Sequence, residues 1–334
     1  MDDTDRKLIL HLSSNPRMSF RELAKNLGIS KQAVHHRIQV LIKIGAIKGT
    51  TAYISVPYLD AIPMAVFGRS KAASIETVFD KLGESELTRR CVAAGGNYLY
   101  VVGLLREISE LDSYAEFVIR TAEMSEPNVG IYSLDTVPMP EYVVDGVGRP
   151  KRSSRELTPL DFHIIASLKD DARRPVAEIA KMIGVSPKTV RRHLTDMMSN
   201  GSLDLSVRFD QPSAGDLMFL SHVNLRNGAD KAEVSRRLLS TYPFPDAYIR
   251  TFGNIPGLLI WIFWTDKLTE MRKILRVARE DEDVLTIVPN FAFLERVYST
   301  WRDGLHEDPA LCAAKARPRK TRTQSGGKRP LSTR

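Results

Sequence analysis

Hydrophobic residues at helical spacing occur in residues 5–45, and the same pattern returns in residues 161–201. The segment ELAKNLGIS (22–30) is matched 156 residues later by EIAKMIGVS (178–186), and the two copies align without a gap. Apolar positions three and four residues apart indicate amphipathic helices. Because a repeat at a fixed offset indicates a duplicated structural unit, we expect two related three-helix units in one chain.

Capping residues predict where the helices of the first unit begin and end. Ser19 followed three residues later by Glu22 is the pattern of a capping box, and Gly28 is a typical left-handed residue at a helix end. Ser30 is expected to cap a third helix. The buried stripe of that helix is expected to comprise Val34, Ile38, Leu41 and Ile42.

The second copy carries equivalent signals. Ser186 is expected to cap its third helix, and Pro187 would occupy the first helical position, where proline is tolerated. Two helices joined by a short glycine-containing turn form a helix-turn-helix. The β-prone residues 46–56 are expected to form the wing of the first unit.

Each unit is followed by a segment that alternates strands and helices in the order βαββαβ, which is the ferredoxin-like plan. We expect strands near 63–69, 87–94, 98–105, 129–137, 217–225, 246–253, 257–264 and 284–290, and helices near 73–83, 109–124, 229–240 and 266–279. The fold class is therefore α+β. The expected divisions are winged units at 1–56 and 156–210, ferredoxin-like domains at 57–140 and 211–306, a linker at 141–155 and a tail at 307–334.

The strand LLIWIFW (258–264) is apolar without interruption, which is typical of a strand covered on both faces. A helix layer on one side and a partner sheet on the other would provide that cover. We therefore expect self-association as a homodimer or larger assembly, with a simple core strand as the alternative. The pattern leaves open whether the two halves pair within one chain or between chains.

Charge is concentrated at one end of the chain. The protein has 48 Lys or Arg and 40 Asp or Glu, a net charge of +8, but residues 313–334 alone contain eight Lys or Arg and no acid, so the remainder is formally neutral. This tail is expected to be disordered and to attract phosphates non-specifically, or to serve solubility. Two distant cysteines and the lack of a long apolar run favour a reducing cytoplasm and no membrane segment.

The third helix of each unit carries the candidate chemistry, because a recognition helix presents the side chains of its first turns to the major groove. Gln can pair with adenine, Arg or Lys can pair with guanine, and the caps and helix N-termini suit phosphates. We expect double-stranded DNA to contact Ser30, Lys31, Gln32, His35, His36 and Arg37 in the first unit, and Ser186, Lys188, Thr189, Arg191 and Arg192 in the second, where His193 is also expected to be exposed.

Other chemistry has weaker support. His35 and His36 point about 100° apart on a helix and lack neighbouring Cys or acidic ligands, so we expect no metal. His11 and His163 lie near apolar stripes and are expected to be structural. The sequence contains no GxSxG, Walker A, HExxH or paired-cysteine motif, so we expect no catalytic residues and no cofactor.

The segment DRKLILHLSSNPRMSFRELAKNLGISKQAVHHRIQVLIKIGAIKG, with CVAAGGNYLYVVGLL further on, resembles the Lrp/AsnC, or feast/famine, family of transcription regulators. The resemblance implies a DNA-binding regulator that assembles through its βαββαβ domains and senses an amino acid or related metabolite. The effector would lie near the turns after the second strands, at Gly95, Gly96, Asn97 and Tyr98, and at Gly253 and Asn254. The family usually has an acidic residue in this turn, and this chain has none there.

Two alternatives to a specific regulator follow. One is a chromosome-organising protein of low sequence specificity, whose basic tail supplies much of the affinity. The other rests on the resemblance of siroheme decarboxylases to this domain plan, in which Arg250, His222 and Tyr248 could serve a tetrapyrrole carboxylate.

Overall fold

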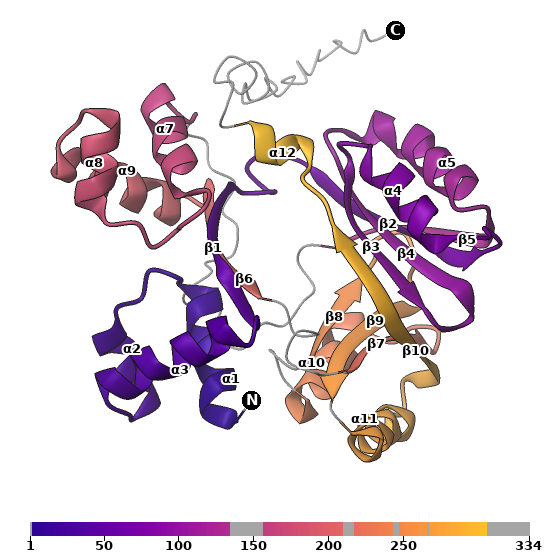
Figure 1. Ribbon diagram of the computed structural model, residues 1–334. Helices are drawn as coiled ribbons and strands as arrows, with labels where there is room; N and C mark the ends of the chain where they lie inside the picture. Colours follow the sequence, from indigo (N-terminus) through magenta and orange to yellow (C-terminus); the bar gives the residue numbers. More distant parts are fainter. Residues whose placement is uncertain (1, 134–155, 210–216, 243–246, 266, 306–334) are drawn as a thin grey trace, which may run out of the picture.

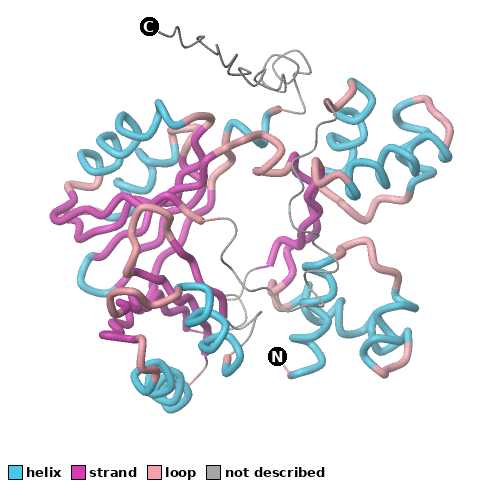
Figure 2. The backbone as a smooth tube through the Cα atoms, turned by 180° about the vertical axis from the view of Figure 1, so that it is seen from behind, coloured by secondary structure: helices cyan, strands magenta, loops and turns pink. Residues whose placement is uncertain are grey.

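Two helical units and one β-barrel make up the protein in the computed structural model, which describes residues 2–133, 156–209, 217–242, 247–265 and 267–305 (Figure 1). The first unit comprises α1 (Asp3–Ser14), α2 (Phe20–Leu27) and α3 (Lys31–Lys43). The second comprises α7 (Pro159–Leu168), α8 (Val176–Ile183) and α9 (Pro187–Ser199). Seen from either side, both units lie on one side of the molecule and the barrel lies on the other (Figures 1 and 2).

The predicted caps are confirmed. The Ser19 hydroxyl accepts from the Glu22 amide at 3.2 Å while the Glu22 carboxylate accepts from the Ser19 amide at 2.9 Å. Gly28 ends α2 with φ +67°, a conformation that L side chains adopt rarely. The Ser30 hydroxyl accepts from the Ala33 amide, and Ser186 caps α9 in the same way.

The expected strand of the first wing forms, and its pairing partner lies in the other unit. Residues Ile47–Ile54 form one strand, β1, but its partner is β6 (Leu203–Phe209) of the second unit instead of a neighbouring strand of its own unit. The two antiparallel strands form a separate two-stranded sheet that joins the helical units. Since each unit contributes one strand, neither can complete this ribbon alone.

The two βαββαβ segments form a single eight-stranded sheet in the order β5-β2-β4-β3-β10-β7-β9-β8. Each half has the ferredoxin-like order fourth-first-third-second. The first half contains β2 (Ile62–Ser70), α4 (Ile75–Gly83), β3 (Thr88–Ala94), β4 (Tyr98–Leu105), α5 (Leu111–Thr121) and β5 (Met124–Ile131), with short 3-10 turns at Gly95–Asn97 and Ile108–Glu110. The second contains β7 (Leu217–Leu225), α10 (Lys231–Thr241), β8 (Ala247–Thr251), β9 (Leu258–Thr265), α11 (Leu268–Glu280) and β10 (Val284–Val297).

The halves meet in the middle of this sheet, between β3 and β10, and again at its two outer strands, β5 and β8, which closes the sheet into the barrel. On one side β10 continues past its own half and pairs with β3 over Ala292–Val297. On the other, a bridge between Tyr132 and Phe252 joins the ends of β5 and β8, and the Gly253 amide donates to the Ile131 carbonyl at 2.9 Å. The Asn254 side chain adds two hydrogen bonds to the β5 backbone, at 2.8 Å each. The halves therefore pair within one chain.

Hydrophobic cores lie on both faces of the sheet. Leu259, Trp261 and Phe263 of β9 pack with α10 and α11, while the alternate residues of the strand pack inside the barrel with Phe67 and Tyr100 of the first half. All eight residues of β9 are buried. The expectation that LLIWIFW is covered by helices and by a partner sheet is correct, but the partner sheet belongs to the same chain. Its burial is therefore not evidence for a second chain.

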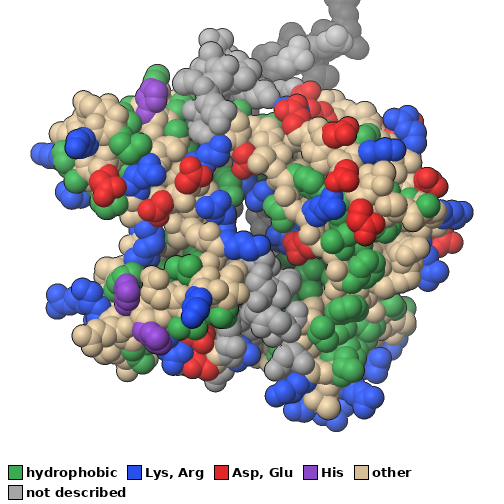
Figure 3. Space-filling view, viewed as in Figure 1, with side chains coloured by type: hydrophobic (Ala, Val, Ile, Leu, Met, Phe, Trp, Pro, Cys, Tyr) green, Lys and Arg blue, Asp and Glu red, His purple; other side chains and the backbone are tan. Residues whose placement is uncertain are grey.

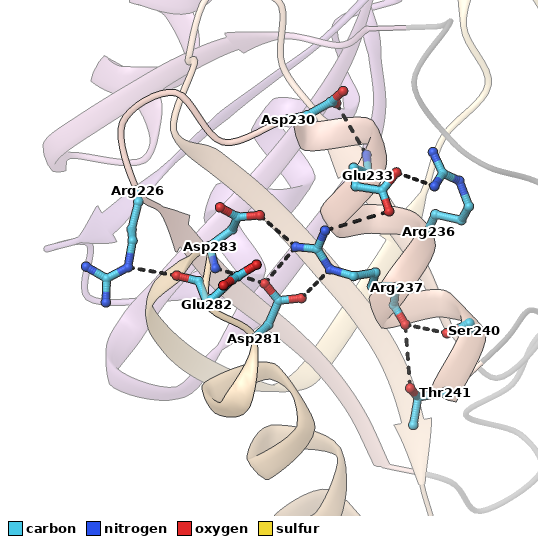
Figure 4. Close-up of polar contacts among 10 residues, drawn as sticks. All are labelled: Arg226, Asp230, Glu233, Arg236, Arg237, Ser240, Thr241, Asp281, Glu282 and Asp283. Atoms are coloured by element: carbon cyan, nitrogen blue, oxygen red, sulfur yellow. Dashed lines mark hydrogen bonds and ion pairs between the residues drawn. The ribbon is translucent and has the colours of Figure 1, made fainter.

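An ion-pair network fixes the helix layer of the second half. Arg237 of α10 donates to Asp281 at 2.7 and 2.8 Å and to Asp283 at 2.8 Å (Figure 4). The two carboxylates raise the pKa of the Arg237 guanidinium above its ordinary value, and Arg237 in turn lowers the pKa of Asp281. This network ties the turn between α11 and β10 to α10.

Several expected boundaries and exposures differ from the structure. Ile42 is 46% exposed, because the buried face of α3 is completed by Val34, Ile38 and Leu41 alone. His163 is exposed, so it is not a core residue. Strand β5 begins at Met124, five residues earlier than expected, and β10 extends seven residues further because it also pairs with β3. The expected linker at 141–155 and the tail at 307–334 lie outside the described residues.

Candidate nucleic-acid interface

The two helical units are joined by a reciprocal pair of arginines. Arg17 donates from Nη1 to the carbonyl oxygens of Ala172 and Arg174, at 2.6 and 3.1 Å. Arg173 donates to the carbonyl oxygens of Pro16 and Met18, at 2.5 and 3.1 Å. Ala172 and Arg174 are the neighbours of Arg173 in the chain, and Pro16 and Met18 are the neighbours of Arg17. Each arginine therefore donates to the carbonyls on either side of the other. The contacts therefore relate the two units by an approximate two-fold axis.

Further contacts across the ribbon support the same arrangement. The Thr51 hydroxyl donates to the Lys169 carbonyl at 2.6 Å, and the Ser55 hydroxyl donates to the Gly201 carbonyl at 2.5 Å. The Arg173 guanidinium also stands 4.9 Å from the ring centroid of Phe20. Together with the β1–β6 pairing, these contacts hold α3 and α9 in a defined relation.

The first recognition helix exposes most of its predicted contact residues. Lys31, Gln32, His35 and His36 are exposed on α3, and Ser30 is exposed at its N-cap. The His35 ring lies edge-on against Phe20, with centroids 5.8 Å apart.

Arg37 differs from its neighbours on α3. Its Nη1 donates to Asp2 at 2.8 Å and to Asp5 at 2.7 Å, so its side chain is directed back to α1. Both carboxylates raise the pKa of the Arg37 guanidinium. Arg37 is therefore held by the start of the chain and is not among the side chains that α3 can offer to a ligand.

The second recognition helix exposes Ser186, Lys188, Arg191 and Arg192, and Thr189 is partly exposed. The expectation that His193 is also exposed is wrong. His193 is 7% exposed, and its Nδ1 lies 2.6 Å from Oδ1 of Asp161, which is fully buried. The offset of 156 makes this pair the equivalent of Arg37 and Asp5, so both units tie the recognition helix to the first helix at one position.

Charge differs between the units. Residues 1–56 contain nine Lys or Arg and four Asp or Glu, whereas residues 156–210 contain eight of each. Figure 3 shows Lys and Arg side chains at the outer edges of both units, and His side chains on both. In the second unit, which is formally neutral, α9 still exposes three basic side chains, Lys188, Arg191 and Arg192.

A short segment after the barrel connects it to the ribbon. In α12 (Trp301–Gly304), the Trp301 indole donates to the Leu104 carbonyl at 2.7 Å, and the Arg302 guanidinium stands 4.4 Å from the ring centroid of Tyr53 on β1. Asp204 of β6 lies in the same junction. Burial raises the pKa of Asp204 to about 6, although the nearby Arg302 acts in the opposite direction.

The predicted effector turns lie at two different places. Gly95, Gly96 and Asn97 form an exposed turn, and Tyr98 packs its ring against Tyr100 and His222, with centroids 5.2 and 5.3 Å away. Gly253 and Asn254 lie at the junction with β5 described above. The structure thus brings Tyr98 to the boundary between the halves and uses Asn254 in joining them.

A hydrogen-bonded group lies behind Tyr98 inside the barrel. Nδ2 of Asn290 donates to the Tyr100 hydroxyl oxygen at 2.8 Å, and that hydroxyl is 2.8 Å from Nε2 of His222. Burial lowers the pKa of His222 to about 4, so the imidazole is neutral near pH 7 and can accept the Tyr100 proton at Nε2. Sequence reasoning did not identify Tyr100 or Asn290, whose positions become related only when the halves pair.

The residues of the tetrapyrrole alternative share one sheet face. His222 and Arg250 pair with Ile260 from its two sides, and Tyr248 lies two residues from Arg250 on β8. The Arg250 guanidinium stands 5.0 Å from the ring centroid of Tyr248 and 5.6 Å from that of Tyr132.

Comparison with known proteins places this architecture in a class of helix-turn-helix proteins. A winged helix-turn-helix DNA-binding family model matches residues 1–48, and an AsnC-type helix-turn-helix model matches residues 157–198. The HTH-type transcriptional regulator Ptr1 of Methanocaldococcus jannaschii is 31% identical over 116 residues, 34% of this chain and 78% of that protein. The regulatory protein AsnC of Haemophilus influenzae is 28% identical over 116 residues, 34% of this chain and 77% of that protein. The chain belongs to the Lrp/AsnC family, and each of these relatives aligns with about a third of it.

One solved structure resembles the whole tandem. The siroheme decarboxylase NirDL covers 94% of this chain and 97% of its own, with a TM-score of 0.60 and 13% sequence identity. At this identity the likeness concerns the fold alone. No helix among the residues that the structure describes is long and apolar enough to cross a membrane.

Proposed function

We propose that this protein is a sequence-specific, double-stranded-DNA-binding transcription regulator, acting in the cytoplasm. The observation that carries the proposal is the reciprocal Arg17 and Arg173 contact, which joins the units of two exposed recognition helices in an approximate two-fold relation, as in helix-turn-helix dimers whose recognition helices enter successive major grooves. The proposed contacts are Ser30, Lys31, Gln32, His35, His36, Ser186, Lys188, Thr189, Arg191 and Arg192. The functions of the family relatives agree with it.

Selection of bound duplexes from a random DNA pool tests this function. The selected duplex should bind at least a hundred times more tightly than a scrambled one of the same composition, at a fixed salt concentration. Equal binding to both would overturn specific regulation and support the chromosome-organising alternative instead. The variant Lys81→Gln, on exposed α4 of the barrel, is the control, since it should leave both affinities unchanged.

An amino acid or related small metabolite is the proposed effector, and Tyr98 is the proposed contact. Support comes from its place at the boundary between the halves, where a bound molecule would contact both. A set of amino acids should include one that raises the midpoint of thermal unfolding, and Tyr98→Ala should remove that rise. A flat response to the whole set would contradict the effector proposal and leave DNA binding unaffected.

We also propose that the protein self-associates, because of an exposed hydrophobic surface on β10 and not because of the buried strand β9. Side chains of β10 that are at least 40% exposed would be covered by a second chain: Leu285, Val288, Phe291, Phe293 and Val297. Hydrophobic side chains gather over β10 on the face seen in Figure 3. The molar mass in solution tests this, and a single-chain mass at micromolar concentration would contradict it.

The tetrapyrrole enzyme is a second candidate, favoured by the whole-length fold likeness and by the shared face of His222, Tyr248 and Arg250. Iron uroporphyrin added to the purified protein should then produce a shifted absorbance band that Arg250→Ala weakens. An unchanged spectrum would reject this candidate.

A further inference from the structure

The recognition helices of the two units are equivalent in position but different in chemistry. Under the offset of 156, Gln32 corresponds to Lys188, His35 to Arg191 and His36 to Arg192. Gln39 corresponds to Thr195 in the same way. All of these side chains are exposed. The units therefore share their framework and differ where a recognition helix meets base edges.

The reciprocal arginine contacts between the units are symmetric to the residue. Arg17 and Arg173 are equivalent under the offset, and their acceptors Pro16 and Met18 are equivalent to Ala172 and Arg174. The β1–β6 ribbon is antiparallel, as a two-fold axis requires. Two recognition helices related by such an axis read opposite strands, so their half-sites are inverted with respect to each other.

We infer that one chain binds one DNA site composed of two unlike, inverted half-sites, with α3 reading one and α9 reading the other. This inference rests on the proposed function. A homodimer of single units can only match a palindrome, whereas this chain carries two different reading surfaces at fixed separation. The α9 half-site would meet three side chains that can pair with guanine, Lys188, Arg191 and Arg192, whereas α3 offers Gln32 and Gln39 for adenine and Lys31 for guanine.

Selection with a variant whose reading surfaces are made alike tests the inference. The variant carries Lys188→Gln, Arg191→His, Arg192→His and Thr195→Gln, which places four side chains of α3 at the equivalent positions of α9, while Pro187 and Thr189 stay as they are. All four positions are at the surface, and an unchanged thermal unfolding midpoint verifies folding. The wild-type chain should select an asymmetric site, and the variant should select a palindrome built from the α3 half-site. Each chain should prefer its own site by about tenfold or more.

The outcomes separate this inference from the proposed function. A palindrome selected by the wild-type chain would overturn the inference while leaving specific DNA binding intact. The same selected site for both chains would also overturn it, because α9 would then read no bases. Selection of no sequence at all would reject both. The matched single variants His36→Ala and Arg192→Ala should each relax specificity in one half-site only, and a loss in both half-sites would contradict separate reading.

Discussion

Arg17 of the first unit and Arg173 of the second occupy equivalent positions, and each donates to the backbone carbonyls that flank the other. Both guanidinium groups are partly buried, and burial lowers their pKa. Neither lies on a recognition helix, yet the relation between the two recognition helices depends on them. In this chain the duplication therefore provides a symmetric framework within one polypeptide.

Replacing either arginine should weaken this framework. Arg17→Ala or Arg173→Ala leaves two carbonyl acceptors in the opposite unit without their donor, and we expect each to lower the free energy of unfolding by about 1–3 kcal/mol. Affinity for the selected DNA should fall as well, because the recognition helices are no longer held at one separation. Urea unfolding and DNA titration measure the two effects. Arg21→Ala, an exposed arginine of α2, is the control for the loss of charge near DNA.

The junction between the ends of β5 and β8 should be destabilised by a side chain at Gly130. A Cβ atom at Gly130 would collide with the ring of Phe252, whereas one at Gly253 would meet nothing closer than the Ser133 hydroxyl at 3.6 Å. Gly130→Ala should cost about 1–3 kcal/mol of stability by overpacking. Gly253→Ala, at the same junction, should cost clearly less. Equal effects in thermal unfolding would contradict the close approach of β5 and Phe252.

Asp204 should make the ribbon less stable at neutral pH than in acid. Its pKa in the folded protein is raised to about 6, so the folded state binds the proton more tightly than the unfolded state. The resulting stability is present at low pH and lost as the pH rises through about 6. Asp204→Asn should therefore stabilise the protein by about 3 kcal/mol above pH 7 and by little near pH 4. A gain that does not vary with pH would show that packing, and not ionisation, is responsible.

The contribution of His222 to the free energy of unfolding should change with pH in the opposite direction. Its pKa falls from 6.5 to about 4 on burial, so the unfolded state binds the proton more tightly. Stability from the neutral imidazole is complete above pH 6.5 and is lost as the pH falls towards 4, a change of about 3 kcal/mol. His222→Gln keeps an acceptor for Tyr100 and does not titrate. The difference in unfolding free energy between the two proteins should shrink with acid, and a constant difference would contradict a buried neutral histidine.

Local features of the sequence predicted local structure well. Ser19, Gly28 and Ser30 have roles set by backbone geometry within one turn of helix, so their positions follow from neighbouring residues. The βαββαβ order likewise follows from alternating hydrophobic patterns. The unbroken strand 258–264 correctly indicated cover on both faces.

Features that depend on distant partners were not predictable in the same way. An apolar strand face is the same whether its cover comes from the same chain or another, so LLIWIFW could not identify the first half as its partner. Arg37 looked equivalent to its exposed neighbours because its pairing with Asp2 and Asp5 depends on how α1 packs. The only sequence signal for the reciprocal arginines was their alignment in the repeat, and that alignment does not by itself indicate contact.

The stoichiometry of the DNA complex tests the central claim most directly. The selected duplex, held far above its dissociation constant, is titrated with protein while its fluorescence anisotropy is followed. If the two units of one chain bind the two half-sites, the signal will saturate at one chain per duplex, whether or not chains associate further. Saturation at two chains per duplex would contradict the account, because each chain would then be using only one of its recognition helices.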